Sequence, residues 1–281
     1  MRVQAKNVLI MSLRHTLVLL IGAFLGYYSS NILLVGVPRS AEQHAGTVEA
    51  SWQAVALQTG TDKSGNPHVE PCFSNKLHCN NYSAMYEEFL TPYRSLPAKI
   101  LEIGLGCDMI YGPGKSLDLW TRYFTNPLVE ITFIELDAQC VQRFGEQIYK
   151  NGKKVSVVAG DQANVSLLAE VTRRYGPFDV VIDDGGHTFH QQRTCIEFFL
   201  NTGLKSSGLL FIEDLHTSFL WKPDVAGADR VNFAFRQLSD VLLSSGLPDK
   251  RYTPTDKTVL NVARFVRWFG CQRRACFIRK T

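Results

Sequence analysis

From Lys99 onward, short runs of β-branched and other apolar residues alternate with longer stretches of helical periodicity. This alternation is typical of a doubly wound α/β fold, a parallel sheet with helices on both faces. We expect five parallel strands, over residues 99–106, 129–137, 154–161, 178–184 and 208–214. Each run ends in an acid or a glycine, and open α/β sheets bind ligands at the carboxyl ends of their strands. The endings therefore predict one shared site.

The expected helices cover residues 138–152, a stretch through Arg174, residues 190–203 and a segment around 229–244. After them, residues 262–270 and 275–280 form two closely spaced runs that predict an antiparallel β-hairpin. The first run also scores as a short helix. Five parallel strands followed by a hairpin indicate the methyltransferase form of this Rossmann-like sheet rather than the dinucleotide-binding form.

The N-terminal region contains an uncharged segment from Thr16 to Val37. A helix needs roughly 20 apolar residues to cross a bilayer, so the segment predicts a transmembrane helix. Basic residues precede it, which places the N-terminus in the cytosol and the rest across the membrane. A cleaved signal peptide and a mitochondrial presequence are the alternatives. The expected organisation is a cytosolic tail at 1–15, a signal anchor at 16–37, a stem at 38–58 and a methyltransferase domain at 59–281.

A lumenal location would favour disulfide bonds and glycosylation. Two cysteine pairs with short spacing, Cys72–Cys79 and Cys271–Cys276, are candidate disulfides, although all seven cysteines could instead be reduced. Two glycosylation tripeptides begin at Asn81 and Asn164. The net charge is only +4, without a broad basic stripe, so nucleic acid is not an expected partner.

The loop after the first strand contains Gly104 and Gly106, which permit a sharp turn and close approach of a ligand to the backbone. A dinucleotide fingerprint needs another small residue where this sequence has Met109, which disfavours an NAD-dependent oxidoreductase. Glu135 ends the second strand, where a carboxylate can accept hydrogen bonds from both ribose hydroxyls. Asp161, after the third strand, is a candidate acceptor for an adenine amino group.

Two acidic pairs close the fourth and fifth strands: Asp183-Asp184, followed by His187, and Glu213-Asp214. These strands are expected to be neighbours, so their carboxylates should converge and bind a hard cation such as Mg²⁺. Such an ion would lower the pKa of a bound hydroxyl, and His187 would accept its proton. The choice between Asp183 and Asp184 stays open, and helix N-capping is the alternative role for these acids.

The motifs LEIGLG, GPGKSLDLW, GDQ, VIDDGGH and IEDLHTS, with TDK and MYEEFLTPYR upstream, resemble the macrocin- and mycinamicin-type sugar O-methyltransferases over residues 59–281. The resemblance implies S-adenosylmethionine, a divalent metal and methylation of a sugar hydroxyl. The implied cofactor-binding residues are Glu102, Gly104, Gly106, Ser116, Glu135, Asp161 and Asp183. The implied metal ligands are Asp184, Glu213 and Asp214, with His187 and Asp184 as catalytic residues.

The chain departs from this group at Gly186, where serine is usual, and in its N-terminal segment. We therefore do not expect this chain to share the macrolide acceptor of that group. We expect an O-methyltransferase acting on a glycan or a glycosylated small molecule, attached to a membrane and compatible with a homo-oligomer. The alternative is a catalytically inactive methyltransferase fold that serves as a membrane-tethered binding module, because fold alone does not prove activity.

Overall fold

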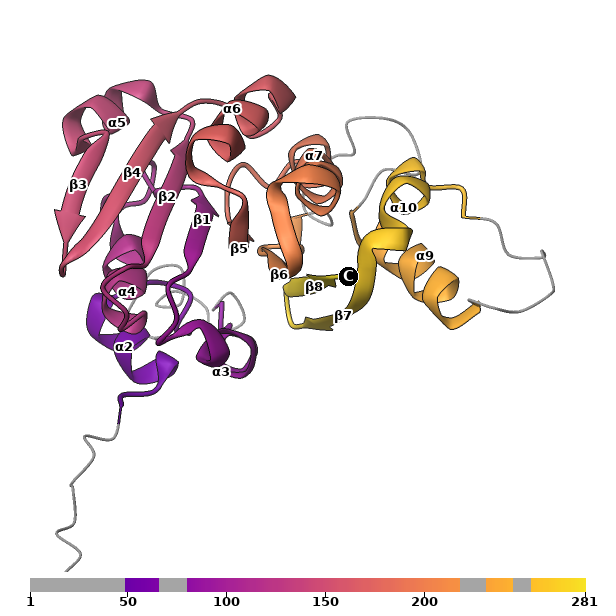
Figure 1. Ribbon diagram of the computed structural model, residues 1–281, viewed down its shortest axis with the longest axis horizontal. Helices are drawn as coiled ribbons and strands as arrows, with labels where there is room; N and C mark the ends of the chain where they lie inside the picture. The colour runs from indigo at the N-terminus through magenta and orange to yellow at the C-terminus, as the bar shows by residue number, and fades with distance from the viewer. Residues whose placement is uncertain (1–48, 66–79, 218–230, 245–253) are drawn as a thin grey trace, which may run out of the picture. The chain divides into compact units, whose positions relative to one another are not determined.

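The computed structural model describes residues 49–65, 80–217, 231–244 and 254–281 (Figure 1). The predicted tail and anchor, at 1–15 and 16–37, and the predicted Cys72–Cys79 pair lie outside these ranges. Within the described ranges, no helix combines the length and the apolar character needed to span a bilayer.

The described residues form one eight-stranded sheet with the order β3-β4-β2-β1-β5-β6-β8-β7. The pairs β1/β2, β2/β4, β1/β5 and β5/β6 are parallel, while β3/β4, β6/β8 and β7/β8 are antiparallel. The strands are β1 (Lys99–Ile103), β2 (Glu130–Glu135), β3 (Gln147–Lys150), β4 (Lys153–Ala159), β5 (Phe178–Asp183), β6 (Leu204–Ile212), β7 (Val266–Gln272) and β8 (Ala275–Lys280). The predicted mostly parallel Rossmann-like sheet with an antiparallel C-terminal hairpin is confirmed.

Helices cover both faces of the sheet (Figure 1). They are α2 (Trp52–Thr59), α3 (Ser83–Leu90), η2 (Thr91–Tyr93), α4 (Lys115–Tyr123), α5 (Ala138–Phe144), α6 (Val165–Tyr175), α7 (Phe189–Phe198), η3 (Phe199–Gly203), α9 (Val231–Ser244), α10 (Lys257–Val262) and η4 (Ala263–Phe265). One core layer packs α2, α3 and α4 on the sheet, and a second packs α6, α7, α9 and α10 on the opposite face. Alternate residues of each strand enter alternate layers.

The predicted helix over 138–152 is wrong in its second half. Helix α5 ends at Phe144, because Gly145 adopts φ +103°, a conformation that side chains disfavour. Residues 147–150 then form edge strand β3, which pairs antiparallel with β4. The connection is Asn151-Gly152, a pair typical of two-residue hairpins, and both residues have positive φ.

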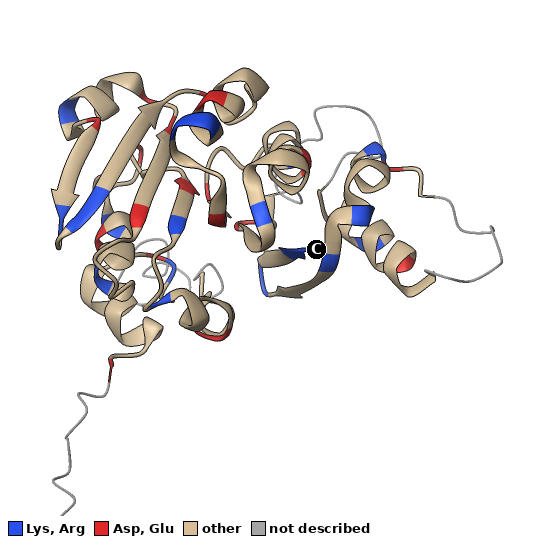
Figure 2. Ribbon diagram, viewed as in Figure 1, with Lys and Arg blue, Asp and Glu red and all other residues tan. Residues whose placement is uncertain are grey.

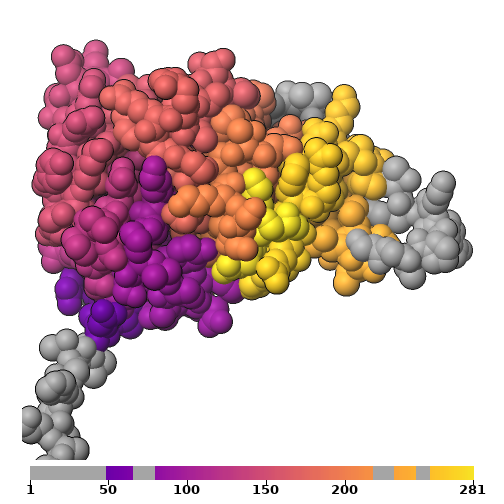
Figure 3. Space-filling view, in the orientation of Figure 1, coloured from indigo at the N-terminus to yellow at the C-terminus, as the bar shows by residue number. Residues whose placement is uncertain are grey.

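The C-terminal hairpin begins later than predicted. Residues 257–265, which include the start of the predicted strand at 262, form α10 and η4, so β7 starts at Val266. Arg273 and Arg274 make the turn to β8. The hairpin pairs with β6 through β8 and lies beside the segment that contains α3 (Figure 3). Phe89 of α3 packs against Phe277 of β8, with ring centroids 4.0 Å apart and ring planes tilted by 30°.

Residues 49–58, predicted as the end of a stem, are part of the folded domain. Ser51 caps α2, and Trp52 and Ala56 are fully buried in the first core layer. The compact unit extends from Glu49 to Thr281 rather than from residue 59. Acidic and basic side chains are interspersed along its described elements (Figure 2).

Candidate active site

A cavity of about 990 Å³ lies at the carboxyl ends of the parallel strands. The loops after β1, β2, β4, β5 and β6 form its wall, together with residues 61–63. Most of the predicted site residues line it: Gly104, Gly106, Ser116, Glu135, Asp161, Asp184, His187 and Asp214. The strand endings thus converge as the sequence pattern predicts.

Three predicted site residues, Glu102, Asp183 and Glu213, are fully buried and are not part of this wall. Glu102 accepts a hydrogen bond from Trp120 of α4 and Glu213 accepts one from Tyr86 of α3, whereas Asp183 accepts one from Gln162 and interacts with Cys195 of α7. Burial raises the pKa of Glu102 to about 7, despite the nearby Lys63 ammonium. Burial also raises the pKa of Asp183. These three acids therefore lie beneath the cavity.

Gly104 occupies a position that no other residue fits. Its φ is +96°, and a Cβ built there would lie 2.2 Å from the carbonyl oxygen of Asp184. Gly106 also has a positive φ, +80°. The loop after β1 is therefore held against the loop after β5, and its backbone faces the cavity without side chains at these two positions.

Glu135 organises the neighbouring loops. Its Oε2 accepts a hydrogen bond from the Leu105 amide at 3.0 Å, and its Oε1 accepts one from the Asp137 amide at 3.0 Å. Each carboxylate oxygen has a second lone pair. Glu135 can therefore fix the turn after β1 and still accept hydrogen bonds from a ligand.

The loop after β4 contributes Asp161 and Gln162. Asp161 is exposed and caps its own loop by accepting from the Ala163 amide at 2.8 Å. Gln162 is buried, donates to Asp183 at 2.8 Å and accepts from the Gly186 amide at 2.7 Å. Asp183 thus acts through Gln162 on the loop that carries His187.

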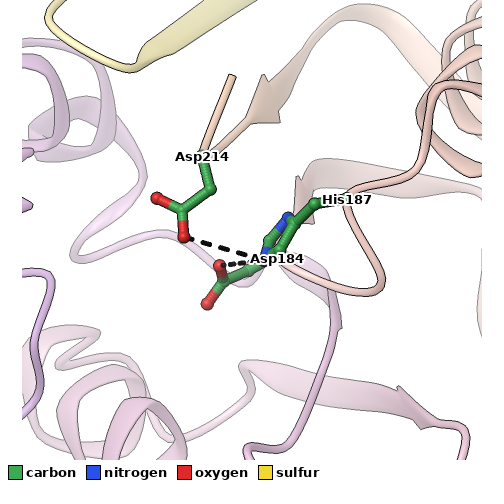
Figure 4. Close-up of side chains that lie close together, drawn as sticks. All are labelled: Asp184, His187 and Asp214. Carbon is green, nitrogen blue, oxygen red and sulfur yellow. Dashed lines mark ion pairs between the residues drawn. The ribbon is translucent and has the colours of Figure 1, made fainter. Parts of the chain in front are cut away.

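Asp184, His187 and Asp214 form a compact group in the cavity (Figure 4). Nε2 of His187 lies 3.9 Å from Asp184 Oδ1 and 3.7 Å from Asp214 Oδ2. His187 has φ +57° and Asp214 has φ +52°, unusual values for residues with a Cβ. Strained backbone of this kind is frequent in functional sites. Of the sequence pair Asp183-Asp184, it is therefore Asp184 that lies beside His187 and Asp214.

Lys63 is the main site residue that sequence reasoning missed. Its side chain is buried, and Nζ bonds Asp184 Oδ2, lies 2.6 Å from Glu213 Oε2 and lies 3.3 Å from Glu102 Oε1. Burial opposes its charge, but these carboxylates outweigh burial and hold the pKa of Lys63 well above its usual value. The TDK motif contains Lys63, but no periodic pattern singled it out.

Two buried tyrosines were also missed. The hydroxyl of Tyr82 donates to Asp214 Oδ1, and the hydroxyl of Tyr86 donates to Glu213 Oε1. Both belong to the chain around α3, far in sequence from their acceptors. The Lys63 ammonium and the two neutral tyrosine hydroxyls do not balance the charges of the surrounding acids. Burial is the largest cause that raises the pKa of Glu213, and the neighbouring Asp184 carboxylate is the second. The same causes raise the pKa of Asp62 to about 6.

The described residues contain two disulfides. Cys271–Cys276 links β7 to β8, as the spacing predicts. Cys107–Cys140 was not predicted; it joins the loop after Gly106 to helix α5, with the Cα atoms 6.2 Å apart. Cys107 also lines the cavity. Cys195 is a buried free thiol.

No protein-family model matches the chain. Among curated proteins, it is 33% identical over 195 residues to the 8-demethyl-8-α-L-rhamnosyl tetracenomycin-C 2′-O-methyltransferase of Streptomyces olivaceus, covering 66% of this chain and 48% of that protein. It is 32% identical over 176 residues to the demethylmacrocin O-methyltransferase of Streptomyces fradiae, covering 60% and 42%. The chain therefore spans about half the length of the curated relatives it matches.

Among solved structures, the chain is similar to MycE, a methyltransferase of the mycinamycin biosynthetic pathway. In its complex with Mg, S-adenosylhomocysteine and mycinamycin VI, the TM-score is 0.61 at 22% identity, over 84% of this chain and 56% of that one. In its complex with Mg and S-adenosylhomocysteine, the TM-score is 0.62 at 22% identity, over 82% and 53%. The fold is thus that of a class I methyltransferase, and the predicted resemblance to sugar O-methyltransferases is confirmed.

Proposed function

We propose that this chain is an S-adenosylmethionine-dependent O-methyltransferase that methylates a hydroxyl of a sugar or a glycosylated molecule. One observation carries the proposal: a single cavity contains the glycine turn and Glu135 on one side and the Asp184–His187–Asp214 group on the other. The first set suits a nucleoside, and the second suits activation of a hydroxyl. The relatives' names describe the same reaction class.

The cofactor would lie against the loops after β1, β2 and β4. Gly104 and Gly106 let it approach the backbone, and Glu135 would accept hydrogen bonds from its ribose hydroxyls. Asp161 would accept from the adenine amino group, and the Ser116 hydroxyl lies on the same wall. Glu102 supports this wall from below, because it accepts a hydrogen bond at 2.7 Å from Trp120 in α4, the helix that carries Ser116.

The residues present also fit a divalent cation. Asp184 and Asp214 each offer a carboxylate oxygen within 4.8 Å of the other and of a ring nitrogen of His187. Two carboxylates with oxygen donors suit Mg²⁺ or Mn²⁺. A cation bound there would lower the pKa of an acceptor hydroxyl.

His187 would accept the proton that the acceptor hydroxyl loses. Its side chain is largely buried in the cavity wall and its Nε2 lies between Asp184 and Asp214 (Figure 4). Imidazole titrates near neutral pH, which suits a general base. Ligation of the cation by Nε2 would exclude this role, so the two roles make different predictions for a His187 variant.

We also propose that residues 16–37 anchor the protein in a membrane, with the catalytic domain in an oxidising lumen. The support is the uncharged segment and the two disulfides among the described residues, since such bonds persist in oxidising compartments. The proposed acceptor is accordingly a glycan or glycoside available in that compartment.

The decisive experiment is transfer of labelled methyl groups from S-adenosylmethionine to a panel of glycans and glycosides. We expect transfer that stops with chelator and resumes with added Mg²⁺. Binding of S-adenosylmethionine without transfer to any member would favour the inactive binding module. Absence of cofactor binding by calorimetry would contradict both.

A further inference from the structure

The turn of the C-terminal hairpin extends the cavity wall beyond β6. Strand β8 pairs antiparallel with β6, and its first residues lie at the carboxyl end of β6, where Ile212 is paired with Cys276. Arg274, two residues before Cys276, lines the cavity. Its carbonyl oxygen accepts a hydrogen bond at 2.8 Å from the amide of Leu215, the residue after Asp214. The hairpin therefore places an arginine at the same edge of the sheet as the strand-end acids.

The strand order assigns Arg274 to the acceptor side of the cavity. Along the sheet the strands follow the order β4-β2-β1-β5-β6-β8. The loops after β4, β2 and β1 would hold the cofactor, and the loops after β5 and β6 contain Asp184, His187 and Asp214. Arg274 lies one strand further along, on the side of this group away from the cofactor loops. The part of the acceptor beyond its reacting hydroxyl would therefore contact Arg274.

The guanidinium of Arg274 is fixed within the wall. Its Nη1 donates to Oδ1 of Asn80 at 3.0 Å, and Asn80 is itself buried and lines the cavity. The backbone of Arg274 has φ +69°. Glycine and asparagine suit this conformation better, so the turn alone does not account for an arginine at this position.

Three lysine and arginine side chains line the cavity among the described residues, namely Lys63, Lys115 and Arg274. Lys63 is 1% exposed, so almost none of it is accessible to a ligand. Lys115 begins α4 and precedes Ser116, which lies on the cofactor side. Arg274 is therefore the cation that the described wall presents to an acceptor.

The segment that contains Arg274 is basic throughout. The last 25 residues contain seven lysines and arginines and no aspartate or glutamate, whereas the net charge of the whole chain is +4. The rest of the chain is therefore net acidic. Figure 2 shows basic residues without acidic ones on β7 and β8. Because a local excess of one charge attracts ligands of the opposite sign, the hairpin side of the cavity favours an anion.

We propose that the acceptor is an acidic glycan, and that Arg274 binds its anionic group, a uronate carboxylate or a sulfate ester close to the hydroxyl that is methylated. A guanidinium binds such an anion through two parallel N–H···O bonds. Asp184 and Asp214 would repel the same anion, so without a cation the site would reject acidic acceptors. The proposal rests on the proposed function, because it names the substrate class of the same site.

The test compares methyl transfer to uronate-containing oligosaccharides with transfer to the same oligosaccharides after reduction of their carboxyl groups to alcohols. A second pair, sulfated oligosaccharides and their desulfated forms, separates the two sources of the anion. All assays contain S-adenosylmethionine and Mg²⁺. Wild-type protein should methylate one acidic set with a kcat/KM about tenfold or more above that of its neutral counterpart.

Arg274→Gln should remove this preference. We expect KM for the acidic acceptor to rise about tenfold, while kcat/KM for the neutral counterpart stays within about twofold of wild type. Arg274→Lys keeps the charge but not the planar fork, so it should restore part of the preference. The matched control is Arg273→Gln, because Arg273 belongs to the same turn but is exposed and outside the described cavity wall. Its preference should equal that of wild type.

A merely structural role for Arg274 predicts another result. Arg274→Gln would then reduce transfer to acidic and neutral acceptors alike, which would overturn the proposal. Wild-type protein that methylates neutral acceptors as well as acidic ones, or methylates no acidic one, also overturns it, and this comparison stands even if Arg274→Gln does not fold. Failure of the proposed function has a separate signature, namely wild-type protein that does not bind S-adenosylmethionine in calorimetry.

Discussion

Glu135 at the end of β2 accepts a hydrogen bond from the amide of Leu105, 3.0 Å away, in the turn that follows β1. The acid proposed to bind the cofactor ribose therefore also fixes the glycine turn on which the cofactor would rest. Two adjacent strands are coupled through one carboxylate.

Glu135→Ala should weaken S-adenosylmethionine binding on the order of 1–3 kcal/mol, about 5- to 150-fold, because it leaves the Leu105 amide and the ribose hydroxyls without an acceptor. Isothermal titration calorimetry measures the change. Glu130→Ala, at the opposite end of the same strand, is the control and should bind normally. Equal affinities of wild type and Glu135→Ala would remove Glu135 from the site.

Gly104→Ala should lower the melting temperature and abolish cofactor binding. The new Cβ would lie 2.2 Å from the Asp184 carbonyl oxygen, in addition to the cost of a positive φ. Gly112→Ala is the matched control, since φ there is +79° but a Cβ meets no atom within 4 Å. Differential scanning fluorimetry should show the larger loss for Gly104→Ala; similar losses would mean that backbone conformation alone matters.

His187→Ala should reduce turnover by about 100- to 10,000-fold, the usual effect of losing a general base. Higher pH should restore part of the rate, because hydroxide replaces the imidazole. Mn²⁺ affinity should stay near that of the wild type. His190→Ala is the control, as His190 is exposed and outside the cavity wall. A large drop in Mn²⁺ affinity would instead identify His187 as a metal ligand.

The raised pKa of Glu102 predicts that the free energy of unfolding depends on pH. Its pKa is raised from 4.5 to about 7 in the folded protein. Its contribution to stability is therefore present below pH 4.5 and is lost as the pH rises to about 7. The unfolding free energy of wild type relative to Glu102→Gln, from urea denaturation, should fall by up to about 3 kcal/mol over this interval. A difference that does not vary with pH would contradict this assignment.

Full-length protein should sediment with membranes after alkaline extraction, and deletion of residues 1–48 should yield a soluble domain with an unchanged melting temperature. Deletion of residues 1–58 should lower that temperature, because it removes the buried Trp52. Full-length protein recovered in the soluble fraction would contradict the anchor.

The parallel strands and the acids that follow them could be predicted because each is a local pattern: an apolar run, then an acid or a glycine. Glu102 was placed correctly on its strand and Glu213 at the end of its strand, but the side of the sheet that each side chain faces depends on strand period and register. The edge strand 147–150 was missed because Gly145 ends a helix that the apolar pattern continues.

Contacts between residues that are far apart in the sequence could not be predicted, because no local sequence pattern indicates them. Lys63 reaches Glu213 across 150 residues of sequence, and Tyr82 reaches Asp214 across 132. Cysteine spacing predicted Cys271–Cys276, whose residues are adjacent in a hairpin, but not Cys107–Cys140, which is separated by 33 residues. Only the folded sheet brings these groups together.

The Cys107–Cys140 bond bears on how the protein should be produced. It fastens the segment after the glycine turn to the helix that follows Glu135, so the two sides of the proposed nucleoside pocket share one covalent link. Expression in a reducing bacterial cytosol would yield chains that lack this link. An inactive preparation from such a host would therefore not show that the protein lacks activity. Protein from a secretory or periplasmic host, where disulfides form, is the appropriate material for the activity assay.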